Sequence, residues 1–183
     1  MKRVLKLLLE TDILFTAALG FLGPIYAIFV GSIGGDILDA SGAWAAFTFT
    51  TGILILLISK MEDKIKDKKK LIFSGYLLKS VAIAGYYFIA APIHLFLVQI
   101  VLGMSEAISV PAYDYLYSKS IDSKKGASQW GLWEGFYNIS IAISALIGGV
   151  IVTIYGFKIL FVLMFLLSLI GLFNAARLAF FNK

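Results

Sequence analysis

The sequence predicts an all-α, polytopic membrane protein with six transmembrane helices in a single domain, residues 1–183. Composition is the first reason: 60% of the 183 residues are hydrophobic, 15% are charged, and the mean hydropathy is +0.92. Apolar residues also gather in six long runs, and basic residues gather on one side of those runs. This composition excludes a soluble enzyme, a nucleic-acid-binding module and a disordered chain. The absence of cysteine excludes disulfides, thiolate zinc sites and a cysteine nucleophile.

Each apolar run is long enough to cross the hydrocarbon core, which is roughly 30 Å thick and needs about 20 helical residues. The six predicted spans are 13–31, 42–58, 71–91, 93–113, 127–154 and 159–178. In the first span Pro24 predicts a kink, and small residues spaced three or four apart predict close helix packing. These small residues are Gly20, Gly23, Ala27 and Gly31. The opposite face of this helix carries Asp12 and Tyr26 and is a candidate cavity lining.

Polar connections separate the later spans in order. The second span lies between 32–41, which carries two aspartates, and 60–70, which carries six lysines. The third and fourth spans lie between this lysine-rich connection and a second basic connection at 119–125. The fifth and sixth spans are separated by a short turn that ends at Lys158.

The distribution of basic residues predicts the orientation of the chain. Fourteen of the 16 Lys and Arg residues lie at the two ends of the chain or in the connections 60–70 and 119–125, all on one side. Because Lys and Arg are enriched on the cytoplasmic side, both termini are predicted to be cytoplasmic, in a cell (plasma or inner) membrane. The pI of about 9.3 is therefore a topology signal. The expected partner is the lipid bilayer, with no nucleic acid.

Three charged residues, Lys79, Glu106 and Glu134, lie inside the spans at a common depth of roughly 12–14 Å from the cytoplasmic ends. A charge at the centre of a span costs about 2.5–3.5 kcal/mol, so each needs a partner or water. Lys79 is long enough to snorkel to the interface or to pair with a glutamate. The glutamates are candidates for a transport role, with a structural ion pair to Lys79 as the alternative. Because burial disfavours the charged form of a carboxylate, either glutamate could take up and release protons.

Each glutamate belongs to a polar stripe with helical spacing. The stripe on the fourth span consists of Gln99, Gly103, Glu106 and Tyr113, and that on the fifth span consists of Trp130, Glu134 and Asn138. Two such stripes at similar depth predict a wet polar cavity. The motifs of nucleotide hydrolysis, zinc proteolysis and serine hydrolysis are missing from the sequence. No enzyme activity, cofactor or metal is therefore expected.

Several motifs resemble those of one half of a major facilitator superfamily transporter. The family's loop between its second and third helices reads G-x-x-x-D-[RK]-x-G-[RK]-[RK]. The connection 59–71 keeps the acidic residue and the basic cluster of this loop but lacks both glycines. The matching residues are Asp63, Lys64, Lys68, Lys69 and Lys70.

Further matches follow along the chain in the family's order. The fourth span keeps Gly103 and the pair Pro111-Ala112, with Gln99 in place of the family's arginine. The fifth span begins with Lys125-Gly126-Ala127, and its antiporter signature is reduced to Ser144-Ala145 followed by Gly148-Gly149. Together these matches cover nearly the whole chain.

The resemblance implies a bundle of three plus three helices related by an inverted repeat. In this family two such halves lie parallel and enclose the substrate pathway, which the first and fourth helices of each half line. The residues that the resemblance places on this pathway are Asp12, Tyr26, Gln99 and Glu106, with Glu134 and Asn138 beside them. Tyr113, on the same stripe as Glu106, is a further candidate for the pathway.

The predicted function is a half-size secondary transporter that acts by alternating access. A closed two-fold dimer is the commonest symmetric assembly, so two copies in the same orientation are expected to form a parallel homodimer. Transport of a small polar or cationic solute is expected to be coupled to protons through Glu106 or Glu134. Two alternatives remain: a monomeric substrate-binding subunit of an energy-coupling-factor importer, and a fragment of a twelve-helix transporter.

Overall fold

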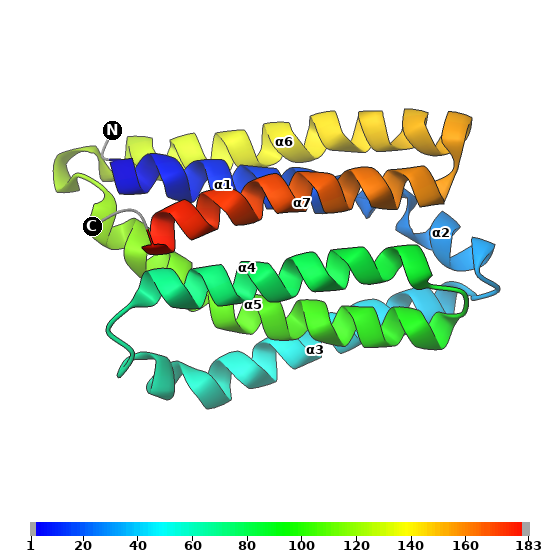
Figure 1. Ribbon diagram of the computed structural model, residues 1–183, viewed down its shortest axis with the longest axis horizontal. Helices are drawn as coiled ribbons and strands as arrows, with labels where there is room; N and C mark the ends of the chain where they lie inside the picture. Colours follow the sequence, from blue (N-terminus) through cyan, green and yellow to red (C-terminus); the bar gives the residue numbers. More distant parts are fainter. Residues whose placement is uncertain (1–2, 181–183) are drawn as a thin grey trace.

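The computed structural model describes residues 3–180, which form helices joined by short connections and contain no strand (Figure 1). Two of the basic residues used for the orientation, Lys2 and Lys183, lie outside this range. The helices are α1 (Arg3–Gly20), α2 (Tyr26–Ser32), α3 (Ile37–Glu62), α4 (Lys68–Gly85), α5 (Pro92–Ser120), α6 (Gly126–Tyr155) and α7 (Phe157–Phe180). The short 3₁₀ helices are η1 (Gly23–Ile25), η2 (Tyr86–Phe88) and η3 (Ser123–Lys125). Six segments of this part of the chain are long and apolar enough to cross a membrane, which confirms the predicted fold class.

The helices extend beyond most of the predicted spans because backbone hydrogen bonding continues past the apolar run. Helix α1 begins ten residues before the predicted start at 13, and α5 continues to Ser120. The third span is the exception. Its helix ends with η2 at Phe88, and residues 89–91 are not helical. This agrees with the steric exclusion of helical backbone immediately before a proline, here Pro92.

The first span is interrupted at the predicted proline. Pro24 lies in η1, and the surrounding hydrogen bonds run over three residues, from the Leu22 amide to the Leu19 carbonyl and from the Ile25 amide to the Leu22 carbonyl. Proline lacks the amide hydrogen that a continuous α-helix would need at this position. The interruption sets Tyr26 at the start of a new helix, α2.

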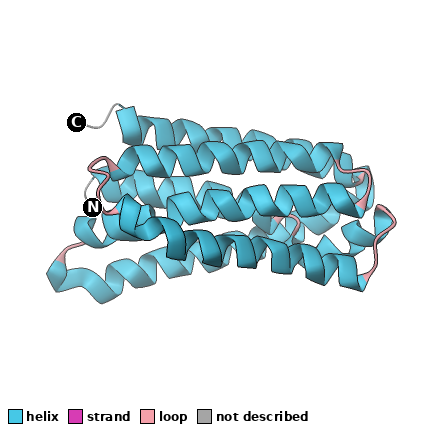
Figure 2. Cartoon of the chain, turned by 90° about the horizontal axis from the view of Figure 1, so that it is seen from below, coloured by secondary structure: helices cyan, strands magenta, loops and turns pink. Residues whose placement is uncertain are grey.

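The bundle consists of two groups of three helices that lie side by side (Figures 1 and 2). Helix α1 packs against α6 and α7, and α5 packs against α3 and α4. The two groups meet mainly where α4 packs against α7. Helices α3 and α6 are at the periphery. Few of their residues are buried, namely Ala40, Ala43 and Glu62 on α3 and Ser144 and Gly148 on α6.

Glycines allow close approach at several helix crossings, but not at all those predicted. A Cβ on Gly148 of α6 would collide with the carbonyl of Phe21, and a Cβ on Gly75 of α4 would lie 2.9 Å from the Ser105 carbonyl of α5. The prediction of a small-residue packing face on the first span is wrong for Gly23 and Gly31, because a Cβ on either would have no neighbour within 4 Å. The chain turns away after the proline interruption, so these residues do not continue the face that begins at Gly20.

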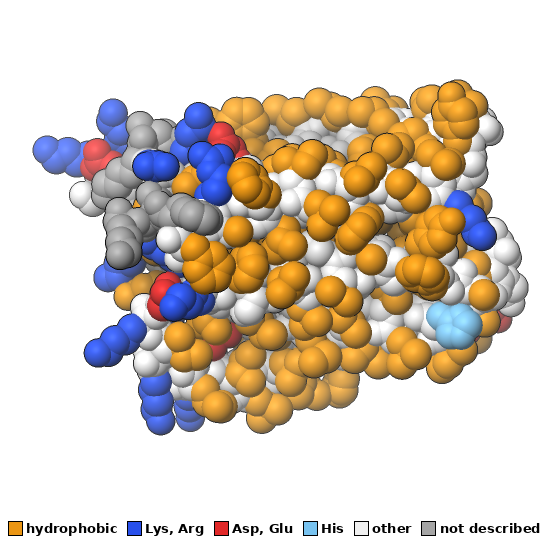
Figure 3. Space-filling view, viewed as in Figure 1, with side chains coloured by type: hydrophobic (Ala, Val, Ile, Leu, Met, Phe, Trp, Pro, Cys, Tyr) orange, Lys and Arg blue, Asp and Glu red, His pale blue; other side chains and the backbone are white. Residues whose placement is uncertain are grey.

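Side chains on the outer surface are arranged as expected for a membrane protein. Large exposed hydrophobic residues occur along every membrane-length segment, and the space-filling view shows them over the middle of the molecule (Figure 3). Most Lys and Arg side chains visible in Figure 3 lie at the end of the bundle where α1 begins and α7 ends (Figures 1 and 3). The single histidine, His94, lies at the opposite end.

Candidate functional site

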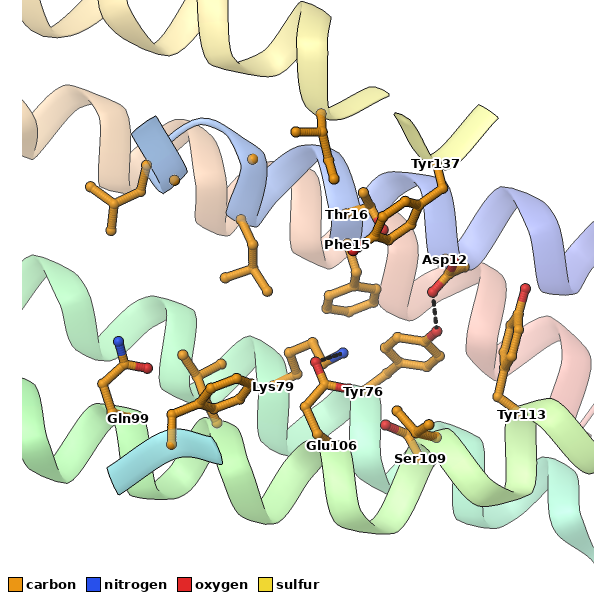
Figure 4. Close-up of a pocket in the computed structure, with 18 of the residues that line it drawn as sticks. Asp12, Phe15, Thr16, Tyr76, Lys79, Gln99, Glu106, Ser109, Tyr113 and Tyr137 are labelled. Carbon is orange, nitrogen blue, oxygen red and sulfur yellow. Dashed lines mark hydrogen bonds and ion pairs between the residues drawn. The ribbon is translucent and has the colours of Figure 1, made fainter. Parts of the chain in front are cut away.

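A cavity of about 700 Å³ lies among helices α1 to α6, and α1, α4 and α5 provide most of its polar lining. The polar and charged residues that face it include Asp12, Tyr76, Lys79, Gln99, Glu106 and Tyr113 (Figure 4). Aromatic side chains form much of the remaining wall, among them Phe15, Trp44, Phe47, Tyr86, Trp133 and Tyr137. A polar, aromatic cavity therefore lies inside a bundle whose outer surface is apolar.

The central charge of the cavity wall is an ion pair between Lys79 on α4 and Glu106 on α5. The Lys79 ammonium lies 2.8 Å from the Glu106 carboxylate, and the two side chains are 7% and 18% exposed. The ammonium also lies 5.0 Å from the centre of the Tyr76 ring and 5.8 Å from that of Phe15, within range of cation–π attraction. Lys79 therefore points into the bundle and does not snorkel to the interface, because it has both a carboxylate and aromatic faces within reach.

Asp12 on α1 has different partners from Glu106. One carboxylate oxygen accepts a hydrogen bond from the Tyr76 hydroxyl at 3.2 Å, and the other accepts one from the Trp133 indole nitrogen at 2.7 Å. Figure 4 shows the Tyr76 hydroxyl pointing at Asp12. The Tyr76 ring is itself held by stacking on Phe15, with ring centres 4.4 Å apart. Asp12 thus links α1, α4 and α6 through two neutral donors.

A third polar contact connects Gln99 and Tyr26. The Gln99 amide nitrogen lies 2.9 Å from the Tyr26 hydroxyl and donates to it. This contact joins α5 to α2, the short helix after the Pro24 interruption. Both residues line the cavity. Gln99 is at the position where the major facilitator motif described above often has an arginine.

Tyr113 presents a hydroxyl that has no hydrogen-bond partner among the described residues. Its side chain is only 4% exposed and lines the cavity. The ring is fixed by stacking on Tyr117, with centres 5.9 Å apart and planes at 11°. A buried hydroxyl without a protein partner normally forms its hydrogen bond with water or with a ligand. Tyr113 is therefore a candidate contact for either.

The structure brings together most of the predicted site residues. Five of them line the same cavity, together with the charge partner Lys79, namely Asp12, Tyr26, Gln99, Glu106 and Tyr113. Gly103, also on the predicted stripe, is at the packing contact of α5 with α3. A Cβ on it would lie 2.6 Å from the Phe47 carbonyl of α3.

Glu134 and Asn138 lie on the exposed surface of α6 and do not line this cavity. The Asn138 amide donates to the backbone carbonyl of Glu134 at 2.8 Å. The cavity is instead lined by Trp133, Tyr137 and Ile141. A shift of one residue turns a side chain by about 100° around a helix, so a stripe displaced by one position faces a different direction.

Sequence reasoning missed Tyr76, Trp133 and Asp114 as cavity residues. Tyr76 precedes Lys79 by three residues, a spacing that places both on one helix face. Trp133 looks like part of an interfacial aromatic belt in the sequence. Its role emerges only when α1 and α6 are packed together, because its partner Asp12 is 121 residues away.

The basic connection between α3 and α4 is exposed for most of its length. Asp63 caps the end of α3, and its amide donates to the Ser59 carbonyl. The Lys68 ammonium donates to the carbonyl of Glu62, and Lys70 lies 3.6 Å from Asp67. Asp63 and Lys68 of the predicted loop motif thus make backbone contacts, and Lys70 forms a local ion pair with Asp67.

Comparison with known proteins agrees with this architecture. Residues 12–183 match the Major Facilitator Superfamily. The chain is 25% identical over 150 residues to an MFS-type transporter of Methanocaldococcus jannaschii, with 80% of this chain and 38% of the relative aligned. It is also 23% identical over 162 residues to the multidrug resistance protein MdtG of Salmonella typhimurium, covering 87% of this chain and 40% of that protein. The corresponding protein of Enterobacter lignolyticus is 22% identical over 177 residues, covering 95% and 41%.

The chain spans about two fifths of the length of these relatives. The family match covers nearly all of its described helices, and the relative from Methanocaldococcus jannaschii is named as an MFS-type transporter. The polar cavity inside an apolar six-helix bundle fits the same conclusion. This chain belongs to the major facilitator superfamily.

Proposed function

We propose that this chain forms one six-helix half of a secondary transporter and that its cavity is part of the substrate pathway. The observation that carries the proposal is the cavity of about 700 Å³, with an ion pair and a second carboxylate inside a membrane-spanning bundle. A charged side chain at this depth in the membrane costs free energy unless it contacts an ion-pair partner, water or a substrate. Membership of a transporter family supports the same conclusion. It also removes the support for a substrate-binding subunit of an energy-coupling-factor importer.

The proposed substrate is a small polar or cationic solute. Asp12, Glu106 and Asp114 contribute carboxylates to the cavity wall, and Lys79 is the single cation among the described residues that line it. The carboxylates thus outnumber the cation, and aromatic faces on several helices add attraction for a positive charge. The names of the MdtG relatives refer to multidrug resistance. For this chain we propose export of the solute, driven by protons.

We further propose that a second copy of the chain, in the same orientation, completes the pathway and that the two halves work by alternating access. Both termini and the lysine-rich connection would then face the cytoplasm. Helices α3 and α6 flank the cavity and bury few residues. Glu134 is exposed within a membrane-length segment, where contact with hydrocarbon would cost about 2.5–3.5 kcal/mol. A second half packed beside α6 would remove that cost.

A second candidate arrangement is favoured by the length of the relatives, of which this chain matches about two fifths. In that arrangement the same cavity is completed by a different six-helix half. The two arrangements share the cavity chemistry and differ in the number of identical chains in each particle.

Gradient-driven movement of an organic cation tests the proposal. The full chain in proteoliposomes with an imposed pH gradient is expected to move ethidium, which a planar aromatic site can bind. Glu106→Gln is expected to abolish this movement, and Glu10→Gln, at a surface glutamate paired with Lys6 on α1, is expected to retain it. Equal transport by both variants would contradict the proposed role of the cavity. No transport by the unaltered chain would contradict completion of the pathway by a second copy and would favour completion by a different half.

A further inference from the structure

The two carboxylates of the cavity differ in what their protonation would do to their neighbours. Glu106 faces the Lys79 ammonium at 2.8 Å. Asp12 accepts hydrogen bonds from the Tyr76 hydroxyl and the Trp133 indole, both of which are neutral. The geometry therefore separates a carboxylate committed to a cation from one held only by neutral donors.

Protonation of Glu106 would leave Lys79 without its counter-ion. The Lys79 side chain is 7% exposed, and its other close neighbours are the rings of Tyr76 and Phe15. An ammonium in such a place is strongly disfavoured once its carboxylate partner is neutral, because little water reaches it. The charged form of Glu106 is therefore the counter-ion that this buried ammonium requires.

Protonation of Asp12 leaves no buried charge without a counter-ion, because both of its hydrogen-bond partners are neutral. A tyrosine hydroxyl can donate or accept, so Tyr76 can turn its hydrogen away and accept the new Asp12 O–H. An indole N–H can only donate, and Trp133 can continue to donate to the other Asp12 oxygen, which is then the carbonyl oxygen of a neutral acid. The contact changes from a charge-assisted hydrogen bond to a weaker neutral one.

We propose that Asp12 is the proton-binding residue of the cavity and that its protonation loosens the contact between α1 and α6 through Trp133. The step is the uptake of one proton from water by the Asp12 carboxylate, with no other bond made or broken. This assignment replaces Glu106 and Glu134, which the sequence alone suggests. It rests on the proposed function only for its role in coupling, since proton binding itself needs no transport.

The groups around Asp12 are consistent with this assignment. On its own helix Glu10 pairs with Lys6 at 3.5 Å. From α4 and α5 it faces Tyr76, Lys79, Glu106, Tyr113 and Asp114, and from α6 it faces Trp133 and Tyr137. On α7 the charged residues are engaged elsewhere, Lys158 over the ring of Tyr87 and Arg177 with Asn174. Lys79 is thus the one cation among the described residues that lines the same cavity as Asp12, and its ammonium is bound to Glu106.

Infrared spectroscopy of the purified full chain tests the assignment. A buried carboxylic acid gives a C=O stretch that disappears on ionisation, and ¹³C labelling of aspartate or glutamate carboxyls identifies the residue type. From mildly acidic to mildly alkaline pH, we expect one titrating band that moves with aspartate label. The band should vanish in Asp12→Asn and persist in Asp114→Asn, an aspartate that lines the same cavity. It should also persist in the charge-balanced variant Lys79→Gln/Glu106→Gln.

A second measurement follows the contact with α6. The chain contains three tryptophans, so the double variant Trp44→Phe/Trp130→Phe leaves Trp133 as the sole source of tryptophan fluorescence. Its emission is expected to shift with the same midpoint as the infrared band, and the shift should be absent when Asp12→Asn is added. A band that moves with glutamate label, or that survives Asp12→Asn, would overturn the assignment, as would the absence of any titrating carboxyl. None of these results depends on whether the protein transports ethidium.

Discussion

At the scale of single residues, the cavity depends on pairs of side chains that come from different helices. The Lys79–Glu106 pair joins α4 to α5, and the Gln99–Tyr26 contact joins α5 to α2. Each pair satisfies a polar group that would otherwise be exposed to an apolar environment. The residues that we propose to recognise a solute therefore also connect the helices of the bundle.

The ion pair should behave as a unit in stability measurements. Removing one partner of a buried pair costs about 3–5 kcal/mol, because it leaves the other charge uncompensated. Lys79→Gln and Glu106→Gln should each lower the unfolding temperature in mild detergent, and the double variant should regain most of the loss. Two single effects that simply add would show that the side chains do not interact.

Tyr113 and Tyr117 form a matched pair for testing the free hydroxyl. The Tyr117 hydroxyl donates to the Gln129 carbonyl at 2.6 Å, whereas that of Tyr113 has no partner among the described residues. Tyr117→Phe should cost about 1 kcal/mol of stability, and Tyr113→Phe should cost little because no protein hydrogen bond is lost. Tyr113→Phe should instead weaken binding of a transported cation, measured by titration calorimetry. Unchanged binding in Tyr113→Phe would remove this residue from the site.

The residues of the cavity could be predicted in part. Asp12, Gln99 and Glu106 could be predicted because a carboxylate or amide inside an apolar run needs a reason to be there. Tyr26 and Tyr113 could be predicted because each shares a helix face with one of these groups. Tyr76 and Trp133 could not be predicted, since aromatic residues are ordinary in membrane helices. Their importance depends on the packing of α1 against α4 and α6, which periodicity does not determine.

At the scale of elements, the packing of the helices has an internal pattern. Suppose that each helix is exchanged with the one three spans further on, α1 with α5, α3 with α6 and α4 with α7. The contacts of α1 with α6 and α7 then become those of α5 with α3 and α4, and the α4–α7 contact maps onto itself. The exceptions are the contacts of α6 with α7 and of α2 with α3, each between consecutive helices of the chain. This pattern supports the inverted repeat that the sequence predicts.

The crossing of α1 and α6 provides a test at this scale. A Cβ on Gly148 would collide with the Phe21 carbonyl, whereas a Cβ on the next residue, Gly149, would have no neighbour within 4 Å. Gly148→Ala should therefore lower stability by about 1–3 kcal/mol, the usual cost of overpacking. Gly149→Ala should leave the unfolding temperature almost unchanged. Equal effects of the two substitutions would show that α1 and α6 do not cross closely at Gly148.

The number of membrane helices could be predicted because bilayer thickness imposes a minimum length on each apolar run. The interruption of the first span could also be predicted, from Pro24. The rotation of α6 could not. Its apolar residues surround the whole helix, so the sequence contains little information on which side faces α1, and the stripe with Glu134 was assigned to the cavity in place of the one with Trp133.

At the scale of the whole molecule, the exposed sides of α3 and α6 and the position of Glu134 support the proposal that a second half completes the cavity wall. The described chain forms walls on part of the cavity, and a second half would provide the rest. Two copies in the same orientation are compatible with the lysine asymmetry, since both would keep their basic ends on one side of the membrane. A homodimer would place Asp12 and the Lys79–Glu106 pair on both walls of a central pathway.

The most direct test is to count fluorescently labelled subunits in single particles reconstituted in native-like bilayers. The account predicts two identical chains in each particle, with Glu106→Gln unchanged in this respect because the pair lies inside one half. Particles that contain a single copy of this chain would contradict the homodimeric transporter.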